Sequence, residues 1–262
     1  VPCDITDKTR PLAAIDDDAK AMSQHLIEFF QNEIKHDRLP KNLLPLQSGV
    51  GSVANAVISG LAQGPFTNLS IFTEVIQDGM FDLIDAGKVE VCSGTALSPS
   101  PDGLKRFYDN VDLYSKKIIL RPQELSNSPE LARRLGVIAM NTAIEFEIFG
   151  NVNSTHIMGS KMMNGIGGSG DFARNAYISI FCTNSVAKDG AISSVVPMCS
   201  HIDHTEHDVM VFCTEQGVAD CRGLAPEERA RLIIKNCAHP DYKPMLEDYL
   251  ERAIVATKHA HT

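Results

Sequence analysis

Short apolar runs alternate along the chain with segments in which apolar residues recur every three or four positions. The runs have the length of strands, and the periodic segments have the length and spacing of helices. Strands are predicted at 43–47, 69–73, 89–92, 117–120, 177–182, 191–197 and 209–213. Because strands alternate with helices over most of the length, the pattern favours an α/β fold with a mostly parallel open sheet flanked by helices. No linker divides the sequence, so one domain is predicted for 1–262.

Residues that stabilise a first or last turn mark the predicted helix ends. Acidic residues at 16–18 predict the start of the first long helix, where the helix dipole favours negative charge. Ser128 followed by Pro129 predicts a capped start for a later helix. The runs at 137–139 and 143–149 are predicted to form a hairpin. Further helices are predicted over 53–61, in a short segment ending at Gly87, and after Pro226 and Pro240.

The composition narrows the class of protein. With 262 residues, of which 44% are hydrophobic, the chain has the make-up of an ordinary globular protein. A net charge of −9 argues against non-specific nucleic-acid binding, and no apolar run is long enough to span a bilayer. The seven cysteines form no Cys-x-x-Cys pair, which favours reduced and mostly buried thiols. A cytoplasmic protein is therefore predicted, or a mitochondrial one in a eukaryote.

A glutamate at the end of an apolar run is the main candidate for chemistry. Glu74 follows the strand predicted at 69–73, and two glycine-rich loops, 47–55 and 163–171, are predicted to face it. Glycine lets the backbone approach a ligand closely and aims peptide N–H groups at developing negative charge. A carboxylate beside two such loops favours acyl transfer through a covalent enzyme intermediate.

The first of these loops also fits a second interpretation. Gly49-x-Gly51-x-x-Ala54 follows a predicted strand and opens a predicted helix, and Glu74 ends the next strand. This is the arrangement of a dinucleotide-binding fingerprint with a ribose-binding carboxylate, as in an NAD-dependent oxidoreductase. Both interpretations rest on the same physics, because a helix N-terminus and glycine backbone bind any phosphate or oxyanion. The second glycine-rich loop has no role in the dinucleotide interpretation.

Seven motifs occur together in a fixed order. They are LQSGVG at 46–51, TEVIQDG at 73–79, GNVNST at 150–155, GGSGDF at 167–172, HIDHTEHD at 201–208, TEQGVAD at 214–220 and NCAHPDY at 236–242. Together they resemble the acetyl-CoA hydrolase/transferase group of family I CoA-transferases, whose members include succinyl-CoA:acetate, propionyl-CoA:succinate and 4-hydroxybutyrate CoA-transferases. The resemblance runs from about residue 26 to residue 242 and is far more specific than one glycine motif.

The resemblance implies a ping-pong transfer of CoA from an acyl-CoA to a short carboxylic acid. Glu74 would attack the thioester to give an acyl-glutamyl anhydride, which the released thiolate converts into a glutamyl-CoA thioester. Water would resolve the intermediate in the hydrolase variant. CoA is then a substrate, and neither a permanently bound cofactor nor a metal is implied.

The resemblance also implies roles for further residues. Backbone N–H groups of Val50 and Gly168 would form the oxyanion hole, and Asn127 and Glu215 match polar residues near the reacting glutamate. The expected contacts with CoA are Gly49, Val50, Gly51, Ser52, Val53, Ile144, Asn164, Gly168 and Lys188.

Only the second half of such a protein is matched. The first half, which in the family helps build the cleft and the dimer, is absent, and the loop-like opening at residue 1 suggests a piece of a longer protein. The expected partners are therefore the other half or a partner subunit, in a homodimer. A non-catalytic CoA-binding fragment is a further alternative.

Several of these residues also have ordinary structural interpretations. Asn127 and Asn164 fit loop positions that satisfy the backbone, and Lys188 fits an exposed hairpin turn. His201-x-x-His204-x-x-His207 has a spacing that suggests a metal site. The stretch precedes a strand, however, and is predicted as a polar loop that ties element ends together.

Overall fold

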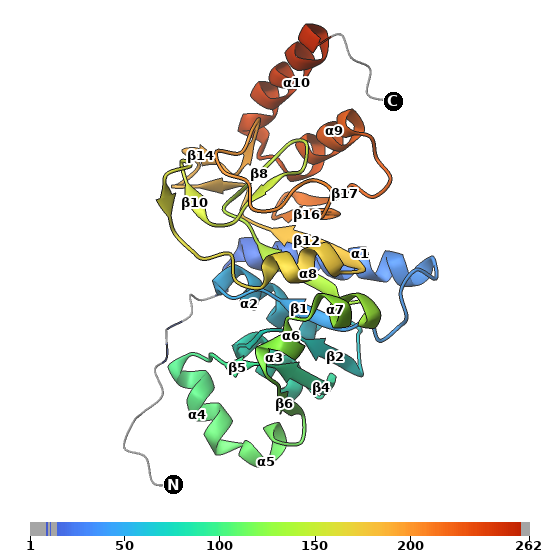
Figure 1. Cartoon of the computed structure of the whole chain (residues 1–262), viewed down its shortest axis with the longest axis vertical. Coiled ribbons are helices and arrows are strands. Elements are labelled where there is room, and N and C mark those ends of the chain that lie inside the picture. The colour runs from blue at the N-terminus through green and yellow to red at the C-terminus, as the bar shows by residue number, and fades with distance from the viewer. Residues whose placement is uncertain (1–8, 10, 12–14, 258–262) are drawn as a thin grey trace.

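The main sheet of the protein is open and almost entirely parallel. The computed structural model describes residues 9, 11 and 15–257. Within them, eight strands form the sheet in the order β17-β16-β12-β7-β1-β2-β4-β6, and neighbours are parallel except β16 with β17 (Figure 1). The strands are β1 (Leu46–Ser48), β2 (Leu69–Phe72), β4 (Val89–Gly94), β6 (Ile118–Leu120), β7 (Ile138–Thr142), β12 (Ile178–Cys182), β16 (Val211–Thr214) and β17 (Gly217–Asp220). The predicted α/β fold with a mostly parallel sheet is confirmed.

Helices cover both faces of this sheet (Figure 1). Helices α1, α2 and α3 contribute to the buried cluster on one face, and α7, α8 and α9 contribute to the clusters on the other. The helices are α1 (Asp17–Lys35), α2 (Ser52–Gly60), α3 (Asp78–Asp85), α4 (Pro101–Asp109), α5 (Val111–Tyr114), α6 (Gln123–Ser126), α7 (Pro129–Leu135), α8 (Ser169–Asn175), α9 (Pro226–Cys237) and α10 (Lys243–Thr257), with 3-10 turns η1 (Leu61–Gln63) and η2 (Pro240–Tyr242).

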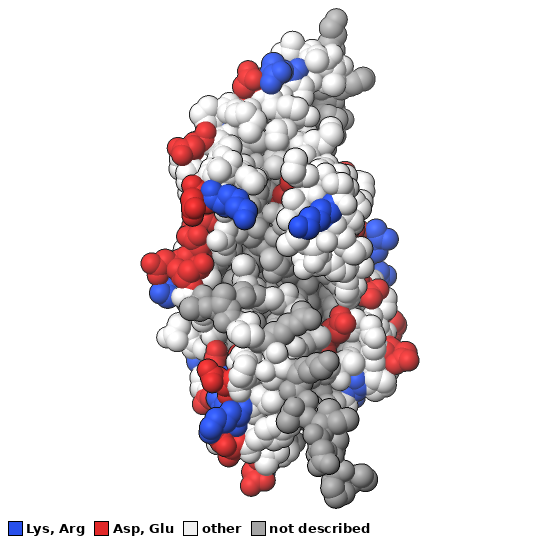
Figure 2. Space-filling model, turned by 90° about the vertical axis from the view of Figure 1, so that its left-hand side faces the viewer, with Lys and Arg blue, Asp and Glu red and all other residues white. Residues whose placement is uncertain are grey.

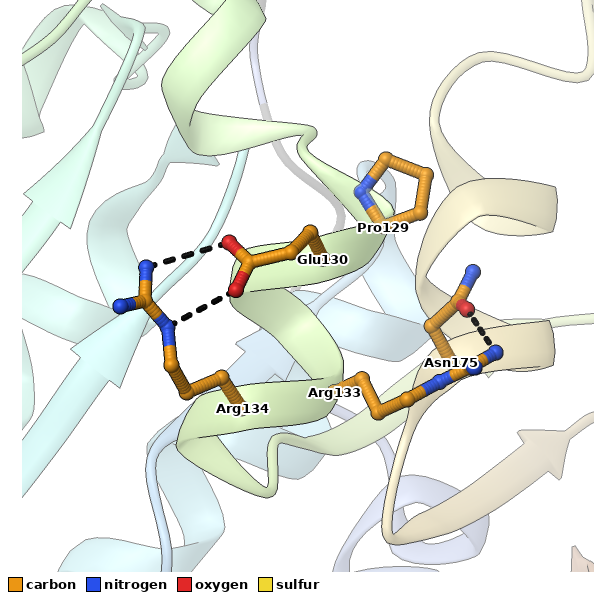
Figure 3. A pocket seen from close by; sticks show the side chains of 5 residues that line it. All are labelled: Pro129, Glu130, Arg133, Arg134 and Asn175. Atoms are coloured by element: carbon orange, nitrogen blue, oxygen red, sulfur yellow. Dashed lines mark hydrogen bonds and ion pairs between the residues drawn. The ribbon is translucent and has the colours of Figure 1, made fainter.

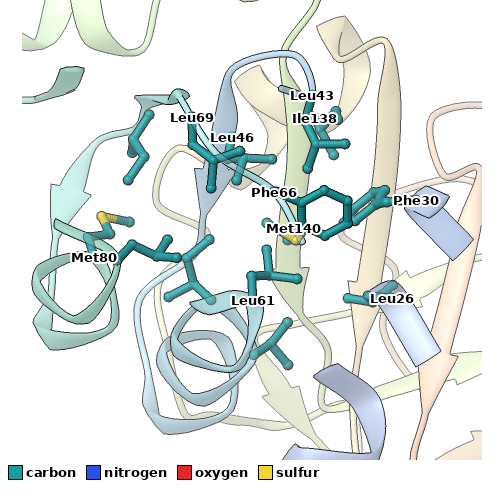
Figure 4. Close-up of a cluster of buried hydrophobic side chains, with 14 of the residues drawn as sticks. Leu26, Phe30, Leu43, Leu46, Leu61, Phe66, Leu69, Met80, Ile138 and Met140 are labelled. Atoms are coloured by element: carbon teal, nitrogen blue, oxygen red, sulfur yellow. The ribbon is translucent and has the colours of Figure 1, made fainter. Parts of the chain in front are cut away.

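Strand β7 shows how the apolar pattern produces these layers. Ile138 and Met140 are buried in the larger cluster beneath α1 to α3, whereas Ala139 is buried on the opposite side against α7 and α8. Figure 4 shows Leu26 and Phe30 of α1 reaching into the larger cluster. Successive side chains of a strand point to opposite faces, so a strand covered on both sides must be apolar throughout.

The predicted helix starts are confirmed by their caps. Asp16 accepts a hydrogen bond from the Ala19 N–H at 2.8 Å, and the Ser128 hydroxyl accepts one from the Leu131 N–H at 3.4 Å. Each side chain satisfies a backbone donor that the first helical turn leaves without a partner.

The predicted hairpin of 137–139 and 143–149 is wrong. β7 pairs in parallel with β1 and β12 in the main sheet, whereas β8 (Glu145–Glu147) joins β9 (Val152–Asn153) and β15 (Val195–Val196) in a separate small sheet. The residues of β7 are buried on both faces, which suits a central strand and not one arm of a hairpin.

The predicted strand at 191–197 is divided into β14 (Ile192–Ser193) and β15. Strand β17 was not predicted. The remaining short pairs are β3 (Val75–Ile76) with β5 (Ala96–Leu97), β10 (His156–Ile157) with β11 (Lys161–Met162), and β13 (Val186–Ala187) with β14.

Charged side chains, cysteines and helices of the described residues can be compared with the expectations from composition. On the face shown in Figure 2, described Lys and Arg side chains are dispersed among acidic ones. The six cysteines of the described part are buried and make no disulfide, as expected of small apolar residues. None of the helices described here is long and apolar enough to cross a membrane.

The strand order reverses between β1 and β7, and this point positions the site. From β1 the sheet grows through β2, β4 and β6 on one side, and from β7 through β12 and β16 on the other. Ligands of open α/β sheets bind outside the carboxyl ends of the strands at such a switch point. Here those ends lead into Gly49, Glu74 and Ala143.

Candidate active site

A cavity of about 610 Å³ lies at this switch point and brings the predicted residues together. Both glycine-rich loops contribute to its wall, and Glu74 faces it from the end of β2. The lining residues are Gln47, Ser48, Gly49, Val50, Gly51, Val53, Glu74, Asn141, Thr142, Ala143, Ile144, Ser154, Met163, Asn164, Gly165, Ile166, Gly167, Gly168 and Ser169.

The Glu74 carboxylate is held by one of its two oxygens. Oε2 accepts hydrogen bonds from Asn127 Nδ2 at 2.9 Å and from the Gly168 N–H at 3.1 Å. Oε1 has no hydrogen-bond partner among the described residues. The backbone of Glu74 is fixed because its carbonyl accepts from the Thr95 N–H at 2.7 Å. One oxygen is thus oriented while the other is available to react.

The amide of Asn127 is oriented from behind. The buried Ser126 hydroxyl donates to Asn127 Oδ1 at 3.0 Å, and Ser126 is itself hydrogen-bonded to the Thr95 hydroxyl. With Oδ1 occupied in this way, the NH₂ group must point to Glu74. The side chain of Asn127 therefore serves the glutamate and not its own loop backbone.

Gly168 leaves no room for a side chain. A Cβ at this position would lie 2.4 Å from Asn127 Nδ2 and 2.5 Å from Glu74 Oε2. Gly167 before it has φ +55°, a left-handed conformation that glycine adopts without strain. The second loop therefore needs glycine for both its turn and its approach to the carboxylate.

The first loop is held by a residue that the sequence analysis missed. The buried side chain of Gln77 accepts a hydrogen bond from the Gly51 N–H at 3.2 Å. Gly51 has φ +129° and comes directly before α2, while a Cβ at Gly49 would lie 2.9 Å from Asn141 Oδ1. The Val50 N–H, between these glycines, has no partner among the described residues.

A second cavity of about 530 Å³ adjoins the first. The two share Val53, Thr142, Ala143 and Ile144 as lining residues. Lys188 lines the second cavity, which we call the far cavity. Lys188 lies in the turn between β13 and β14 with φ +55°, which confirms its hairpin interpretation. The two cavities therefore lie side by side, with Glu74 lining the first and Lys188 the second.

Two other residues expected to contact CoA lie in the walls of these cavities. Ile144 lines both cavities, and the exposed Asn164 lines the first, where its Nδ2 donates to the Ser154 carbonyl at 3.4 Å. Ser52 begins α2 beside the first loop.

Glu215 lies elsewhere on the same edge of the sheet. It follows β16, which is four strands from β2, a separation of roughly 19 Å at about 4.8 Å per strand. Its carboxylate accepts from the Ser185 N–H at 2.7 Å and from Gln216 Nε2 at 3.0 Å, and it binds the Ser185 hydroxyl. Glu215 therefore supports the segment that leads to the far cavity and does not contact Glu74.

The three histidines of the HIDHTEHD motif point to different partners. His201 pairs with Asp203 at 3.1 Å, His204 is buried, and the exposed His207 lies 3.4 Å from Glu206. Within the residues that the structure describes, no group of three or more His, Cys, Asp or Glu side chains could hold a metal ion. The motif forms the polar loop of the structural interpretation.

Another cavity, of about 440 Å³, lies on the outer side of α7 and α8 (Figure 3). Its arginines are already engaged: Arg134 pairs with Glu130 at 3.0 Å, and Arg133 donates to Asn175 at 2.7 Å. Because both guanidinium groups already have partners, this cavity is a poor candidate site for an anionic ligand.

The family model for the acetyl-CoA hydrolase/transferase C-terminal domain matches residues 103–250. The chain belongs to this family. Its similarity extends beyond the matched region, because the first glycine-rich loop and Glu74 also lie within the alignments to whole relatives described next.

Curated relatives of the chain include both a CoA-transferase and an acetyl-CoA hydrolase. The chain is 64% identical over 247 residues to the succinyl-CoA:acetate CoA-transferase of Clostridium kluyveri, covering 94% of this chain and 46% of the relative. It is 52% identical over 257 residues to an acetyl-CoA hydrolase of Candida albicans, covering 96% of this chain and 49% of that protein. The chain thus spans about half the length of the curated relatives it matches.

A solved structure gives the same picture of the fold. The crystal structure of RipA from Yersinia pestis superposes with a TM-score of 0.77 at 25% identity, covering 94% of this chain and 55% of that one.

Proposed function

We propose that this chain provides the glutamate half of an enzyme that moves CoA between an acyl-CoA and a short carboxylic acid. The observation that carries the proposal is that the Glu74 side chain lines the cavity while its Oε2 is held by Gly168 and Asn127. Membership of the acetyl-CoA hydrolase/transferase family supports it.

The reaction begins with attack by Glu74 Oε1 on the thioester carbonyl of the acyl-CoA. The C–S bond breaks, the thiolate leaves, and an acyl-glutamyl anhydride forms. The thiolate then attacks the glutamyl carbonyl, which releases the first acid as its carboxylate and leaves a glutamyl-CoA thioester. The acceptor acid repeats these steps in reverse, leaving as its CoA thioester and restoring the Glu74 carboxylate.

The donors on Oε2 suit the charge that this sequence develops. When the thiolate attacks the glutamyl carbon, negative charge collects on Oε2, 3.1 Å from the Gly168 N–H and 2.9 Å from Asn127 Nδ2. The Val50 N–H is the candidate donor for the oxyanion of the acyl group. Such donors typically contribute about 3 kcal/mol each to transition-state stabilisation.

Two adjoining cavities suit the long CoA molecule. We place its pantetheine arm against Gly49 to Val53 and Ile144, beside Asn164, with Lys188 towards the phosphates. Remote contacts of this kind supply binding energy that orients the thioester at Glu74. Two glycine-rich loops on one cavity favour this ligand over a dinucleotide, which would leave the contact between Gly168 and Glu74 without a role.

Hydrolysis of the acyl-CoA is the second candidate, since a relative with 52% identity is named an acetyl-CoA hydrolase. Water would then replace the acceptor acid at the same intermediate. The expected partner is a polypeptide that corresponds to the other half of the relatives, and the protein assembled from both halves is expected to form a homodimer. Without that partner, the chain would bind CoA without turnover.

An exchange assay tests the function. The chain is combined with this completing polypeptide and incubated with acetyl-CoA and labelled succinate, and separately with acetyl-CoA alone. Labelled succinyl-CoA is expected for a transferase, and loss of thioester without acceptor for a hydrolase. Neither product, from a mixture shown to have assembled, would contradict both functions.

A further inference from the structure

A buried histidine lies directly behind the glycine turn that carries Gly168. The His204 side chain is 3% exposed, and its Nε2 lies 3.1 Å from the Ser169 hydroxyl and 3.4 Å from the Ser154 hydroxyl. The Ser169 hydroxyl in turn donates to the Ile166 carbonyl at 2.7 Å. His204 is thus connected through one residue to the turn that presents an amide to Glu74.

Counting protons fixes the direction of these hydrogen bonds. Ser169 has one hydroxyl proton, and the Ile166 carbonyl accepts it. The contact between His204 and Ser169 therefore requires a donor on the imidazole, which is the Nε2–H of the neutral ring. Burial lowers the pKa of His204 and so favours this neutral form.

The ring is held in place by its own surroundings. The His204 backbone pairs with Val152, donating at 3.1 Å and accepting at 2.8 Å. Its ring packs 4.8 Å from the ring of Phe181, measured between centroids, and Phe181 belongs to β12 of the main sheet. The backbone pairing and the ring contact thus anchor His204 against the main sheet.

The turn that His204 supports is short and rich in glycine. Gly167 and Gly168 are its central residues, and Gly168 caps α8 without a side-chain hydrogen bond. The Ser169 N–H reaches the Ile166 carbonyl only at 3.4 Å, so the shorter Ser169 hydroxyl contact closes the turn.

We propose that His204 is a positioning residue, which acts through Ser169 to aim the Gly168 N–H at Oε2 of Glu74. The His204 side chain has no hydrogen bond to Glu74 in the described part of the chain, and it does not line the cavity. The kinetic part of this inference rests on the proposed function, whereas the geometric part does not.

Two substitutions separate the donor from the packing. His204→Phe keeps the ring on Phe181 but removes the donor, and His204→Gln places an amide N–H near the position of Nε2. We expect His204→Phe to slow formation of the glutamyl thioester by about tenfold with little change in KM, the effect of one lost hydrogen bond, and His204→Gln to restore most of the rate.

A spectroscopic readout works without turnover. The ¹H–¹⁵N resonance of Gly168 is compared between wild type, His204→Phe and His204→Gln, with thermal melting as the check on folding. We expect the resonance to move in the Phe variant and to return in the Gln variant. His207→Phe, a change of an exposed histidine in the same motif, is the matched control and should leave it in place.

The outcomes are distinct. A Gly168 resonance that stays in place in His204→Phe, or that moves equally in the Phe and Gln variants, would overturn the role of the Nε2–H. Failure of the wild type to form any thioester counts against the proposed function, and the resonance comparison then decides the role of His204 alone. Ser169→Ala combined with His204→Phe should have no more effect than either change by itself, because both break the same connection.

Discussion

Two glutamates follow the carboxyl ends of strands in the same sheet, Glu74 after β2 and Glu215 after β16, but their hydrogen bonding differs. Both oxygens of Glu215 accept hydrogen bonds, from Ser185 and Gln216, whereas only Oε2 of Glu74 does so within the described residues. Burial disfavours the ionised form of Glu215, but hydrogen bonds from Ser185 and then Gln216 outweigh it and hold its pKa below the usual value. A saturated carboxylate holds backbone together, while a half-satisfied one remains available as a nucleophile.

The largest contrast is expected from changing each glutamate to glutamine. Glu74→Gln should lower the rate of thioester formation by at least about 10³-fold, as expected for loss of a nucleophile, with little change in stability. Glu215→Gln should instead lower the free energy of unfolding by about 1–3 kcal/mol, because the N–H and hydroxyl of the buried Ser185 lose a charged partner. Rates from mass spectrometry and denaturant titrations measure the two effects. Equal loss of stability in both variants would remove the distinction.

The next effect concerns the space around Glu74. Gly168→Ala should reduce the rate by about 10²-fold or more, because the new methyl group displaces Oε2 or the Asn127 amide and so removes a donor from the developing oxyanion. Gly170→Ala is the matched control, since its Cβ would meet no atom closer than 4.0 Å. Similar rates in the two alanine variants would contradict the close packing at Gly168.

The donors on Oε2 form a graded series. Asn127→Ala should reduce the rate by roughly 10²–10³-fold, the typical effect of losing an oxyanion donor. Ser126→Ala, which only frees the amide to rotate, should reduce it by about tenfold or less. Single-turnover kinetics measures both. A larger loss of rate in Ser126→Ala than in Asn127→Ala would contradict the proposal that Ser126 acts through Asn127.

The smallest effect is a pH dependence of stability at His204. Burial is the main cause of its lowered pKa and outweighs the attraction of Asp203 and Asp208 for the cation, while Arg174 opposes the cation further. The unfolded chain, with an ordinary histidine pKa of about 6.5, therefore takes up a proton that the folded chain resists. The contribution of His204 to stability is therefore fully present above a pH of about 6.5 and is lost as the pH falls below it. Unfolding titrations of His204→Gln should show a shallower loss between about pH 6.5 and 5; an unchanged slope would contradict it.

The sequence was sufficient for most strands of the main sheet and for the meeting of Glu74 with the two glycine-rich loops. Apolar runs located the parallel strands, and the glycine-rich loops and Glu74 were expected to meet. The supporting residues were not predicted, because hydrogen bonds such as that of His204 with Ser169 join positions 35 residues apart and leave no local pattern. The histidine spacing was the only signal there, and it suggested a metal.

Gln77 shows the same limit on the other side of the cavity. Its contact with Gly51 joins positions 26 residues apart, and a glutamine after an apolar strand has no signature of its own. Strand β7 was placed in a hairpin because its apolar run does not reveal which strands it pairs with; only the burial of both faces identifies a central strand.

Mass spectrometry of peptides after incubation with an acyl-CoA tests the central claim most directly, with the completing polypeptide present. We expect a mass increase equal to CoA minus water on the peptide that contains Glu74, which hydroxylamine removes and which is absent from Glu74→Gln. Transfer of CoA with no adduct on that peptide, or with an adduct on a different residue, would contradict it.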